Sequence, residues 1–273
     1  MTTMSDLAPE LVGEILTSNH EKILVWNLYL GQTRLIKTIR NLQITNQYAL
    51  GHDSSGNQKI LKFSDCREAV FKYEIYDFSS DSWKVLSIPR DWSIPPCQCG
   101  LSLKGNTYFI ASSIKGLACF LLCFDFTREK FGQLLRLPCH AFGYPVTLSC
   151  VREEQLAVLY LEKKDEILEI WVTNKIESNI VSWSKFLKVS IRIKPFDVYG
   201  RSFFIDEEKR VAVVFSQGKK YSTGTYKTAY IIGEDQCLKS VRIGESRKDM
   251  RKPLVFSSYL PSLEQIYQPP KNK

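Results

Sequence analysis

The pattern that sets the architecture is Tyr73-Glu74-Ile75-Tyr76-Asp77-Phe78-Ser79-Ser80-Asp81-Ser82-Trp83-Lys84-Val85-Leu86. Its first half alternates apolar and polar residues, its middle consists of serine and aspartate, and its second half opens on tryptophan and continues with apolar residues. Serine and aspartate are turn residues, and alternation is the signature of a half-buried strand. The stretch therefore predicts a β-hairpin with a short polar turn.

The same hairpin pattern occurs five times along the chain. Its central residues are separated by 50, 48, 47 and 60 positions, and they are Trp26, Tyr76, Phe124, Trp171 and Ile231. A repeat of this size built from strands is typical of kelch-type propeller blades. A second hairpin precedes the second to fifth copies, which predicts four-stranded units over about 48–86, 100–137, 146–189 and 200–243.

The two ends of the repeat region are half-units. Residues 21–37 form a hairpin with no partner before it, and residues 253–266 supply apolar strand material with no partner after it. Pairing the two ends would complete a fifth blade and protect exposed strand edges. We therefore predict an all-β, kelch-like β-propeller of about five blades over residues 21–267, followed by a frayed tail at 268–273.

One short helix is predicted ahead of the strands, over residues 5–17. Ser5 or Asp6 can cap it and Pro9 suits its first turn. Its apolar residues share one face, and they are Leu11, Val12, Ile15 and Leu16. A helix this short needs a partner for that face.

Composition favours a large intracellular domain, in the cytoplasm or nucleus. A chain of 273 residues can bury a core without disulfides, and no apolar run approaches the roughly 18 residues of a membrane span. Asp6, Glu10 and Glu14 interrupt any secretory signal pattern, and several of the eight cysteines lie in apolar strand patterns, as free thiols do. The net charge of +8 is spread along the chain, and the densest cluster, 247–252, has no interleaved aromatic residue. Neither a nucleic-acid nor a membrane partner is predicted, although a basic surface favours an acidic protein partner.

Catalytic and metal chemistry are disfavoured by the motifs. His52-Asp53 falls at a hairpin turn, where solvated side chains are expected. A mixed metal site from Cys97, Cys99, Cys139 and His140 matches no zinc-finger spacing, so buried or loop thiols are the favoured interpretation and a metal site is the minor alternative. We predict no enzyme activity and no cofactor, with a hydrolase or metal enzyme as the least favoured function.

The tryptophans have two interpretations. Those at 26, 83, 171 and 183 occupy repeat positions, so packing between blades is favoured over a ligand-binding face. Trp92 lies outside the repeat, in a proline-bearing stretch, 87–99, that is predicted to be a long loop. Trp92 is therefore a weak candidate for substrate binding.

Several stretches resemble a known family. Ser5-Asp6-Leu7-Ala8-Pro9-Glu10-Leu11-Val12-Gly13-Glu14-Ile15-Leu16 resembles the opening of the F-box motif. Val25-Trp26-Asn27-Leu28-Tyr29-Leu30-Gly31-Gln32-Thr33-Arg34 is similar to the start of the plant F-box-associated domain. Further stretches also fit that domain, and they are 73–83, 151–160, 182–186 and 202–209. Ala8 stands where the F-box usually has its proline, and Gly13 stands at a commonly acidic position.

The resemblance implies a substrate receptor of SCF (Skp1–cullin–F-box) ubiquitin ligases. In that family the F-box helices bind a Skp1-type adaptor, and the associated domain holds the protein to be ubiquitinated. The implied adaptor-binding residues are Leu7, Pro9, Leu11, Val12, Ile15 and Leu16. Ser18-Asn19-His20 leads almost directly into the Trp26 hairpin, so residues 1–18 are interpreted as a truncated F-box helix. The alternative is a protein-interaction module with a degenerate F-box, uncoupled from ubiquitination.

Overall fold

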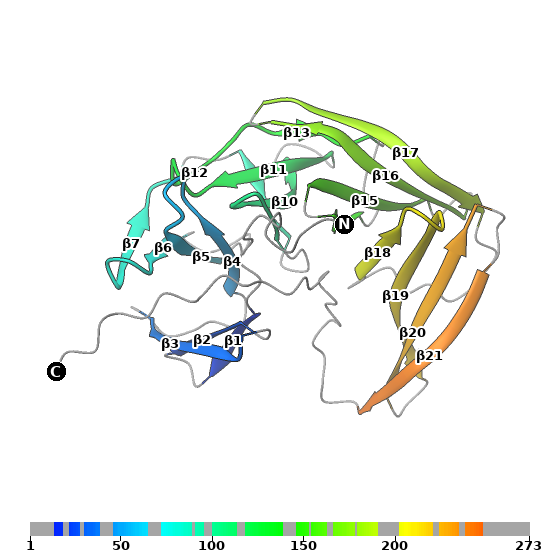
Figure 1. Ribbon diagram of the computed structural model, residues 1–273, viewed down its shortest axis with the longest axis horizontal. Coiled ribbons are helices and arrows are strands. Elements are labelled where there is room, and N and C mark those ends of the chain that lie inside the picture. The colour runs from blue at the N-terminus through cyan, green and yellow to red at the C-terminus, as the bar shows by residue number, and fades with distance from the viewer. Residues whose placement is uncertain are drawn as a thin grey trace, which may run out of the picture. The chain divides into compact units, whose positions relative to one another are not determined.

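The computed structural model shows an all-β protein (Figure 1). It describes residues 14–18, 22–27, 30–38, 46–64, 72–88, 91–95, 100–113, 118–138, 146–152, 154–162, 166–177, 179–190, 202–220, 224–234 and 238–247. Every regular element in these ranges is a strand, and they contain no helix that could span a membrane. The strands form five antiparallel sheets, in agreement with the predicted fold class.

Three of the sheets are four-stranded meanders, in which each strand pairs with the next along the chain. One contains β4 (Asn46–His52), β5 (Gln58–Ser64), β6 (Lys72–Asp77) and β7 (Ser82–Leu86). Another contains β14 (Val146–Val151), β15 (Gln155–Glu162), β16 (Ile167–Ile176) and β17 (Val181–Ser190). The third contains β18 (Ser202–Asp206), β19 (Val211–Lys220), β20 (Gly224–Gly233) and β21 (Leu238–Arg247). Their limits lie within a few residues of three predicted units.

The remaining predicted unit, 100–137, is a six-stranded sheet that begins earlier than predicted. Its strands are β8 (Trp92–Ser93), β9 (Leu101–Leu103), β10 (Asn106–Ser113), β11 (Cys119–Asp125), β12 (Lys130–Phe131) and β13 (Leu135–Arg136). Two short strands, β12 and β13, take the place of one outer strand in this sheet, since both pair with β11. The loop predicted over 87–99 is therefore wrong at β8, which pairs with β10.

The first sheet contains β1 (Glu14–Ser18), β2 (Lys22–Asn27) and β3 (Gln32–Lys37). The hairpin predicted over 21–37 is confirmed as β2 and β3. The helix predicted over 5–17 is wrong at residues 14–17. They form β1, in register with β2 from Glu14 opposite Trp26 to Ser18 opposite Lys22. A short isolated helix must offset a costly nucleus, whereas a strand here adds to an existing sheet and contains the β-branched residues Ile15 and Thr17. Residues 5–13 and the proposed partner segment 253–266 lie outside the described residues.

The described residues divide into two compact units. The first comprises the described residues up to 109 and residues 122–134, and the second comprises 110–121 and 135–247. In the first unit, apolar residues of the β1–β3 sheet pack against apolar residues of the β4–β7 sheet, and they are Ile23, Val25, Ile36, Leu50, Ile60, Tyr76 and Phe78. In the second unit, a larger core lies between the β14–β17 and β18–β21 sheets.

The other face of the β4–β7 sheet is aromatic. Phe63 stacks on Tyr73 with ring centroids 5.6 Å apart and meets Phe109 edge-on at 5.5 Å. Both faces of this sheet are therefore buried, and even charged residues of its two middle strands, among them Lys62 and Glu74, are buried. Burial of such rings is the main favourable term in packing sheets face to face.

Two of the repeated tryptophans connect neighbouring sheets by hydrogen bonds. In the first unit, Trp83 of β7 donates its indole Nε1–H to the carbonyl oxygen of Lys37, at the end of β3, at 2.8 Å. In the second unit, Trp183 of β17 donates in the same way to the carbonyl oxygen of Arg136 at 3.1 Å. Both tryptophans are half-buried. The packing role that the sequence favoured for these positions is confirmed for Trp83, which packs against the core between the β1–β3 and β4–β7 sheets.

We expect Trp83→Phe to lower the free energy of unfolding by about 1 kcal/mol, because the ring is kept and one hydrogen bond is lost. The measurement is urea unfolding followed by circular dichroism. Trp171→Phe is the control, since the indole of Trp171 donates to Glu169 in its own strand at 3.0 Å and joins no neighbouring sheet. If Trp83→Phe and Trp171→Phe lower the free energy of unfolding equally, the hydrogen bond between the sheets stabilises the protein no more than one within a strand.

Candidate functional site: a polar network at the turns of the first unit

Three hairpin turns of the first unit share one local design. They are the turns between β2 and β3, between β6 and β7, and between β11 and β12. The residue before the turn accepts hydrogen bonds from backbone N–H groups inside it. Asn27 accepts from Leu30 at 3.1 Å, Asp77 from Ser79 at 2.8 Å, and Asp125 from Thr127 at 2.9 Å. A side-chain oxygen at this position organises the turn without help from the sheet.

The last residue of each turn has a left-handed backbone. The φ angles are +64° at Gly31, +51° at Asp81 and +51° at Glu129. Glycine adopts this conformation without cost, whereas a side chain there requires support from its surroundings. Asp81 and Glu129 receive that support from basic side chains of the preceding sheet.

Asp81 and Glu129 each pair with a cation from the sheet before their own. Arg34 Nη2 lies 2.8 Å from Asp81 Oδ1, and Lys84 Nζ lies 2.7 Å from Glu129 Oε2. Arg34 and Lys84 are both the third residue of an outer strand, β3 and β7 respectively. The same ion pair between adjacent sheets therefore occurs at equivalent positions of two repeats, as Arg34–Asp81 and as Lys84–Glu129.

Arg34 is the more deeply placed of these two cations. Its Nη2 also donates to the Tyr76 hydroxyl at 2.8 Å, and its guanidinium lies 4.9 Å from the centre of the Phe78 ring. Tyr76 donates in turn to Asp81. Burial and the bond to Asp81 raise the pKa of Tyr76 above its ordinary value, and the bonds from Tyr76 and Arg34 hold the pKa of Asp81 below its ordinary value. Tyr76 therefore stays a neutral donor and Asp81 a charged acceptor.

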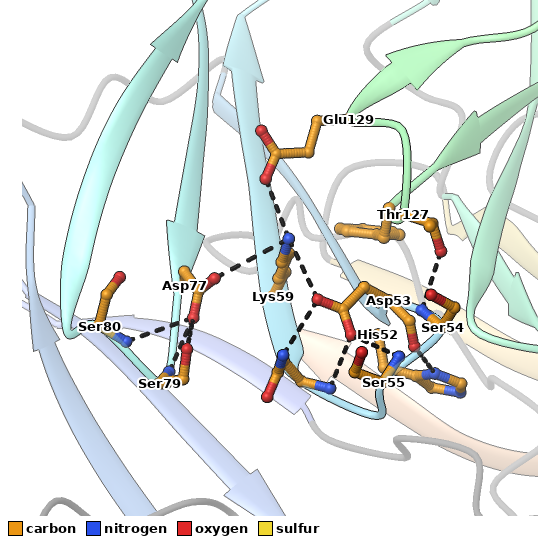
Figure 2. A network of polar contacts seen from close by, with 12 residues as sticks. His52, Asp53, Ser54, Ser55, Lys59, Asp77, Ser79, Ser80, Thr127 and Glu129 are labelled. Carbon is orange, nitrogen blue, oxygen red and sulfur yellow. Dashed lines mark hydrogen bonds and ion pairs between the residues drawn. The ribbon is translucent and has the colours of Figure 1, made fainter.

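Lys59 of β5 lies at the centre of the network drawn in Figure 2. Its Nζ is 2.9 Å from Glu129 Oε1, 3.4 Å from Asp53 Oδ2 and 3.8 Å from Asp77 Oδ2. The Lys59 side chain is only 8% exposed, so a charge there needs these partners. The network joins two turns of the β4–β7 sheet to the turn between β11 and β12.

The pKa values of this group follow from the balance between burial and pairing. Burial alone would raise the pKa values of Asp53, Asp77 and Glu129. Hydrogen bonds from Asn57 to Asp53, from Ser79 to Asp77, and from Lys84 and Lys59 to Glu129 oppose this effect. Together with the charge of Lys59, they hold all three pKa values below their ordinary values. Burial lowers the pKa of Lys59, but Glu129 and Asp53 raise it above its ordinary value overall. At neutral pH all four groups are therefore charged.

The turn between β4 and β5 is tied to the same network. Asp53 Oδ1 accepts from the backbone N–H of Ser55 at 2.9 Å and of Asn57 at 3.0 Å. The N–H of Ser54 donates to Thr127 Oγ1 at 2.9 Å, and the N–H of His52 donates to the Gly105 carbonyl oxygen at 3.0 Å. His52-Asp53 was predicted to be a solvated turn; the turn is confirmed, but Asp53 has a side chain only 15% exposed and is engaged with Lys59.

The arrangement is better suited to holding the turns together than to catalysing a reaction. Each acid at its centre already binds a cation or backbone N–H groups, so none is poised to take a proton from a bound molecule. Within the ranges that the structure describes, no three His, Cys, Asp or Glu side chains are grouped to hold a metal ion. Burial raises the pKa of the Cys123 thiol to about 12, which makes it a poor nucleophile.

We expect Lys59→Met to lower the free energy of unfolding at pH 7 by about 2 kcal/mol, because three clustered carboxylates lose their shared cation. The depressed pKa values of Asp53, Asp77 and Glu129 contribute stability above the ordinary carboxyl pKa, and this contribution is lost as pH falls through the folded-state values. The raised pKa of Lys59 contributes stability below 10.5, and this is lost as pH rises through its folded-state value.

The measurement is urea unfolding of both proteins at pH 7 and pH 3. The difference between wild type and Lys59→Met should be smaller at pH 3, which lies below the ordinary carboxyl pKa values of 3.8 and 4.5, because the contribution of the carboxylates declines there as pH falls towards their folded-state values. Lys104→Met, at the exposed turn before β10, is the matched surface control and should change little at either pH. A difference that is the same at both pH values would contradict the ion-pair explanation.

The structure corrects the prediction for Trp92. This residue was a weak candidate for substrate binding because its stretch was predicted to be a loop, but it is only 5% exposed, with its ring 4.7 Å from Phe131 and 6.4 Å from Tyr73. The rings of the β4–β7 sheet leave an apolar surface that Trp92 covers, and burial of a large aromatic ring outweighs the loop character of its neighbours.

The predicted adaptor-binding residues are only partly described. Ile15 and Leu16 are in β1, opposite Val25 and Leu24, whereas Leu7, Pro9, Leu11 and Val12 lie outside the described residues. Cys97, Cys99, Cys139 and His140, the residues of the disfavoured metal site, lie outside them as well. Their roles stay predictions.

The sequence analysis missed Arg34, Lys59 and Glu129. A signal was present, because the repeats align Asp81 with Glu129 and Arg34 with Lys84, so that an acid and a cation recur at fixed positions. The burial of Lys59 had no comparable signal, since it depends on Glu129, which is 70 residues away.

The sequence of this chain is similar to those of known proteins. The model of the F-box associated beta propeller domain matches residues 15–266, starting inside β1. The F-box/kelch-repeat protein At3g13680 of Arabidopsis thaliana is 49% identical, over 92% of this chain and 70% of the relative. The F-box protein At3g49510 of the same plant is 45% identical, over 92% of this chain and 71% of the relative. Among solved structures, AofleA from Arthrobotrys oligospora covers 83% of this chain and 67% of its own, with a TM-score of 0.46 and 11% identity.

Proposed function

Because this chain belongs to the family of F-box associated β-propeller domains, we propose that it is a non-enzymatic substrate receptor of SCF ubiquitin ligases, in which the propeller binds the target protein. The observation that carries the proposal is the close relation to plant F-box proteins over nearly the whole chain. The absence of a free acid–base pair in the network around Lys59 supports a binding role.

Adaptor binding is assigned to the residues before the first sheet. The candidates are Leu7, Pro9, Leu11 and Val12, with Ile15 and Leu16 as the remaining members of the predicted set. Because Ile15 and Leu16 are in β1, replacing them would disturb the sheet as well as any adaptor contact. Leu11 is therefore the residue on which adaptor binding is best tested.

The test is co-purification of the full chain with a Skp1-type adaptor. We expect the adaptor to be retained by the intact chain and lost with Leu11→Asp, because a carboxylate in an apolar contact cannot be desolvated without cost. Leu35→Asp is the matched control: Leu35 is 52% exposed on β3, so this variant should retain the adaptor. Failure of the intact chain to retain any adaptor would contradict the receptor proposal.

The second candidate is an interaction module uncoupled from ubiquitination. It is favoured by one observation: Ile15 and Leu16, two of the six predicted adaptor-binding residues, belong to a strand of the first sheet and not to a helix. This candidate gives a different result in the same experiment, since target capture would persist in Leu11→Asp while adaptor capture would be absent from the intact chain.

For either candidate, we propose that the target binds away from the turns of the network. Those turns are held by ion pairs and by bonds to their own backbone, which reduces their capacity to adapt to a partner. We expect the exposed turn variants Ser80→Arg and Arg128→Glu to leave target capture unchanged. Loss of capture in both would place the target on the turn end instead.

A further inference from the structure

The hairpin between β16 and β17 extends beyond its sheet. β15 pairs with β16 only up to Val172, whereas β16 and β17 stay paired up to Ile176 opposite Val181 (Figure 1). In the β6–β7 hairpin, by contrast, the neighbouring strand β5 pairs up to Asp77, the last residue of β6. Residues 173–183 are therefore a two-stranded ribbon with its turn, and we name this segment the ribbon.

The ribbon is fixed at its base and at its turn. At the base, Thr173 is 1% exposed, and its Oγ1 accepts the backbone N–H of Leu156 at 2.9 Å. Gln155 donates through Nε2 to the carbonyl oxygen of Thr173 at 2.6 Å. In the turn, the N–H of Glu177 donates to the carbonyl oxygen of Ile180 at 2.9 Å. Because these bonds order the ribbon in advance, a partner that binds it loses less entropy.

The tip of the ribbon is apolar. Ile180 in the turn is 50% exposed, and Ile176 and Val181, which lie opposite each other, are half-buried. The described core between the β14–β17 and β18–β21 sheets includes none of the three. Turn residues are normally polar, and the turns 78–81 and 126–129 expose serine, threonine and arginine instead. Aliphatic side chains on a fixed tip are suited to enter a pocket on a partner.

Basic side chains lie around the base of the ribbon. Lys185 and Lys188 of β17 both pair with Glu169, each with its Nζ 3.1 Å from Glu169 Oε1. Arg136 of β13 has an exposed side chain, and its carbonyl oxygen accepts the indole N–H of Trp183 in the ribbon. Three cations are thus balanced by one carboxylate, so this surface is positively charged and attracts an acidic partner.

We propose that the ribbon binds the target protein: its tip enters an apolar pocket on the target, and the cations at its base face acidic side chains beside that pocket. This inference rests on the proposed function, because it names the site that holds the target. Lys185 is roughly 17 Å along the strand from Ile180, so both fit within one interface of about 800 Å² per partner. The tip supplies the buried contact, and the charges steer the encounter.

A second copy of the chain and a membrane surface fit the ribbon less well. Each copy has a net charge of +8, so two copies repel each other where an acidic protein is attracted. Residues 174–182 contain no aromatic residue of the kind that anchors a protein at a membrane interface. The Glu177 side chain beside the tip is 51% exposed and would have to enter the membrane surface with it. An acidic protein surface is therefore the occupant that the ribbon fits best.

The test compares the proteins that the full chain captures from a plant-cell extract, identified by quantitative mass spectrometry. We expect one protein to be lost with Ile180→Asp and kept with Leu35→Asp, the matched control, since Leu35 is 52% exposed on β3. Once purified, that protein should bind Ile180→Asp on the order of 100-fold more weakly than the wild type, because a carboxylate resists transfer into an apolar pocket. Ile180→Val keeps the apolar character and should restore binding to within a few-fold of the wild type.

The charges are tested on the same purified protein. Lys188→Glu should slow its association on the order of 10-fold at low salt, and the difference from the wild type should shrink as salt is added. Lys104→Glu, at the exposed turn before β10, is the matched control and should leave the association rate unchanged. An equal slowing by both variants would show that the overall charge, and not the base of the ribbon, attracts the target.

Three results would overturn the inference. The first is a target that Ile180→Asp captures as well as the wild type does, which would place the target elsewhere and leave the proposed function intact. The second is self-association in sedimentation velocity that Ile180→Asp abolishes, which would assign the tip to a second copy. The third is sedimentation with phosphatidylcholine–phosphatidylserine vesicles that Ile180→Asp abolishes, which would assign it to a membrane.

The proposed function and the ribbon fail in different ways. An intact chain that retains no adaptor but loses a purified partner with Ile180→Asp would contradict the receptor proposal and support the ribbon as the binding site. Capture of no protein by the wild type would count against both. Ile180→Asp should keep the urea midpoint of the wild type, because the position is exposed. If the midpoint falls, Ile180→Ser takes its place, with an expected loss of affinity on the order of 10-fold.

Discussion

Replacing Glu74 by alanine is expected to lower the free energy of unfolding by about 3–5 kcal/mol, because it leaves the ammonium group of Lys62 buried without a counter-charge. The two residues face each other across β5 and β6, with Lys62 Nζ 2.8 Å from Glu74 Oε2. Their side chains are 6% and 5% exposed, respectively, so water cannot replace the lost partner. The measurement is urea unfolding at pH 7, with hydrogen exchange of β5 as a second readout.

The double variant Lys62→Met with Glu74→Leu separates loss of a partner from loss of the pair. It removes both charges and keeps similar volume, and we expect it to unfold within about 1 kcal/mol of the wild type. Glu177→Ala is the surface control, since Lys175 and Glu177 form a pair at 2.9 Å with more than half of each side chain exposed, and its expected loss is below about 1 kcal/mol. If Glu74→Ala costs no more than Glu177→Ala, Lys62 reaches water and the buried-pair interpretation is wrong.

Replacing Gly51 by alanine is expected to cost about 3 kcal/mol or more, because β4 passes too close to its neighbours to accept a methyl group. A Cβ atom on Gly51 would overlap the ring of Phe126 and the carbonyl oxygen of Gly105. The ring is held at 4.9 Å from Phe124, and the carbonyl accepts the N–H of His52, so neither can move away cheaply. The expected result is a lower urea midpoint, with the slope of the transition unchanged.

Gly56→Ala is the matched control for Gly51→Ala. Gly56 has a φ of +80° and open space around its Cα, so its substitution costs only the backbone preference, about 1 kcal/mol. Combining Gly51→Ala with Phe126→Leu should give less than the sum of the single effects, because the smaller side chain relieves part of the overlap. Simple additivity would show that Phe126 is not what excludes a side chain at Gly51.

Most of the sheet structure could be predicted from the sequence because hairpins are local. The alternation around Tyr76 and the serines after Asp77 specify a strand, a turn and a second strand within fourteen residues, and the structure forms them as β6 and β7. The same local reasoning located three four-stranded sheets to within a few residues of their limits. It failed at β1 and β8, which are short and take their structure from pairing with β2 and β10.

The site was far less predictable. Lys59 and Glu129 look like ordinary solvated charges in the sequence, yet they meet across 70 residues in a buried network. Trp92 looks like an exposed loop residue, yet it covers the rings of Tyr73 and Phe131. In each case the environment of the side chain is built by a distant sheet, and no local pattern reports it.

By itself, the amino-acid sequence determined the five repeated hairpins and their polar turns, because these depend on neighbours a few positions apart. Only the tertiary structure decided that Glu14–Ser18 pairs as a strand, that Lys62 and Glu74 are buried together, and that Asp81 and Glu129 join one sheet to the one before it. The physical reason is that burial and charge pairing depend on which surfaces come together in space, and those surfaces belong to sheets that are tens of residues apart.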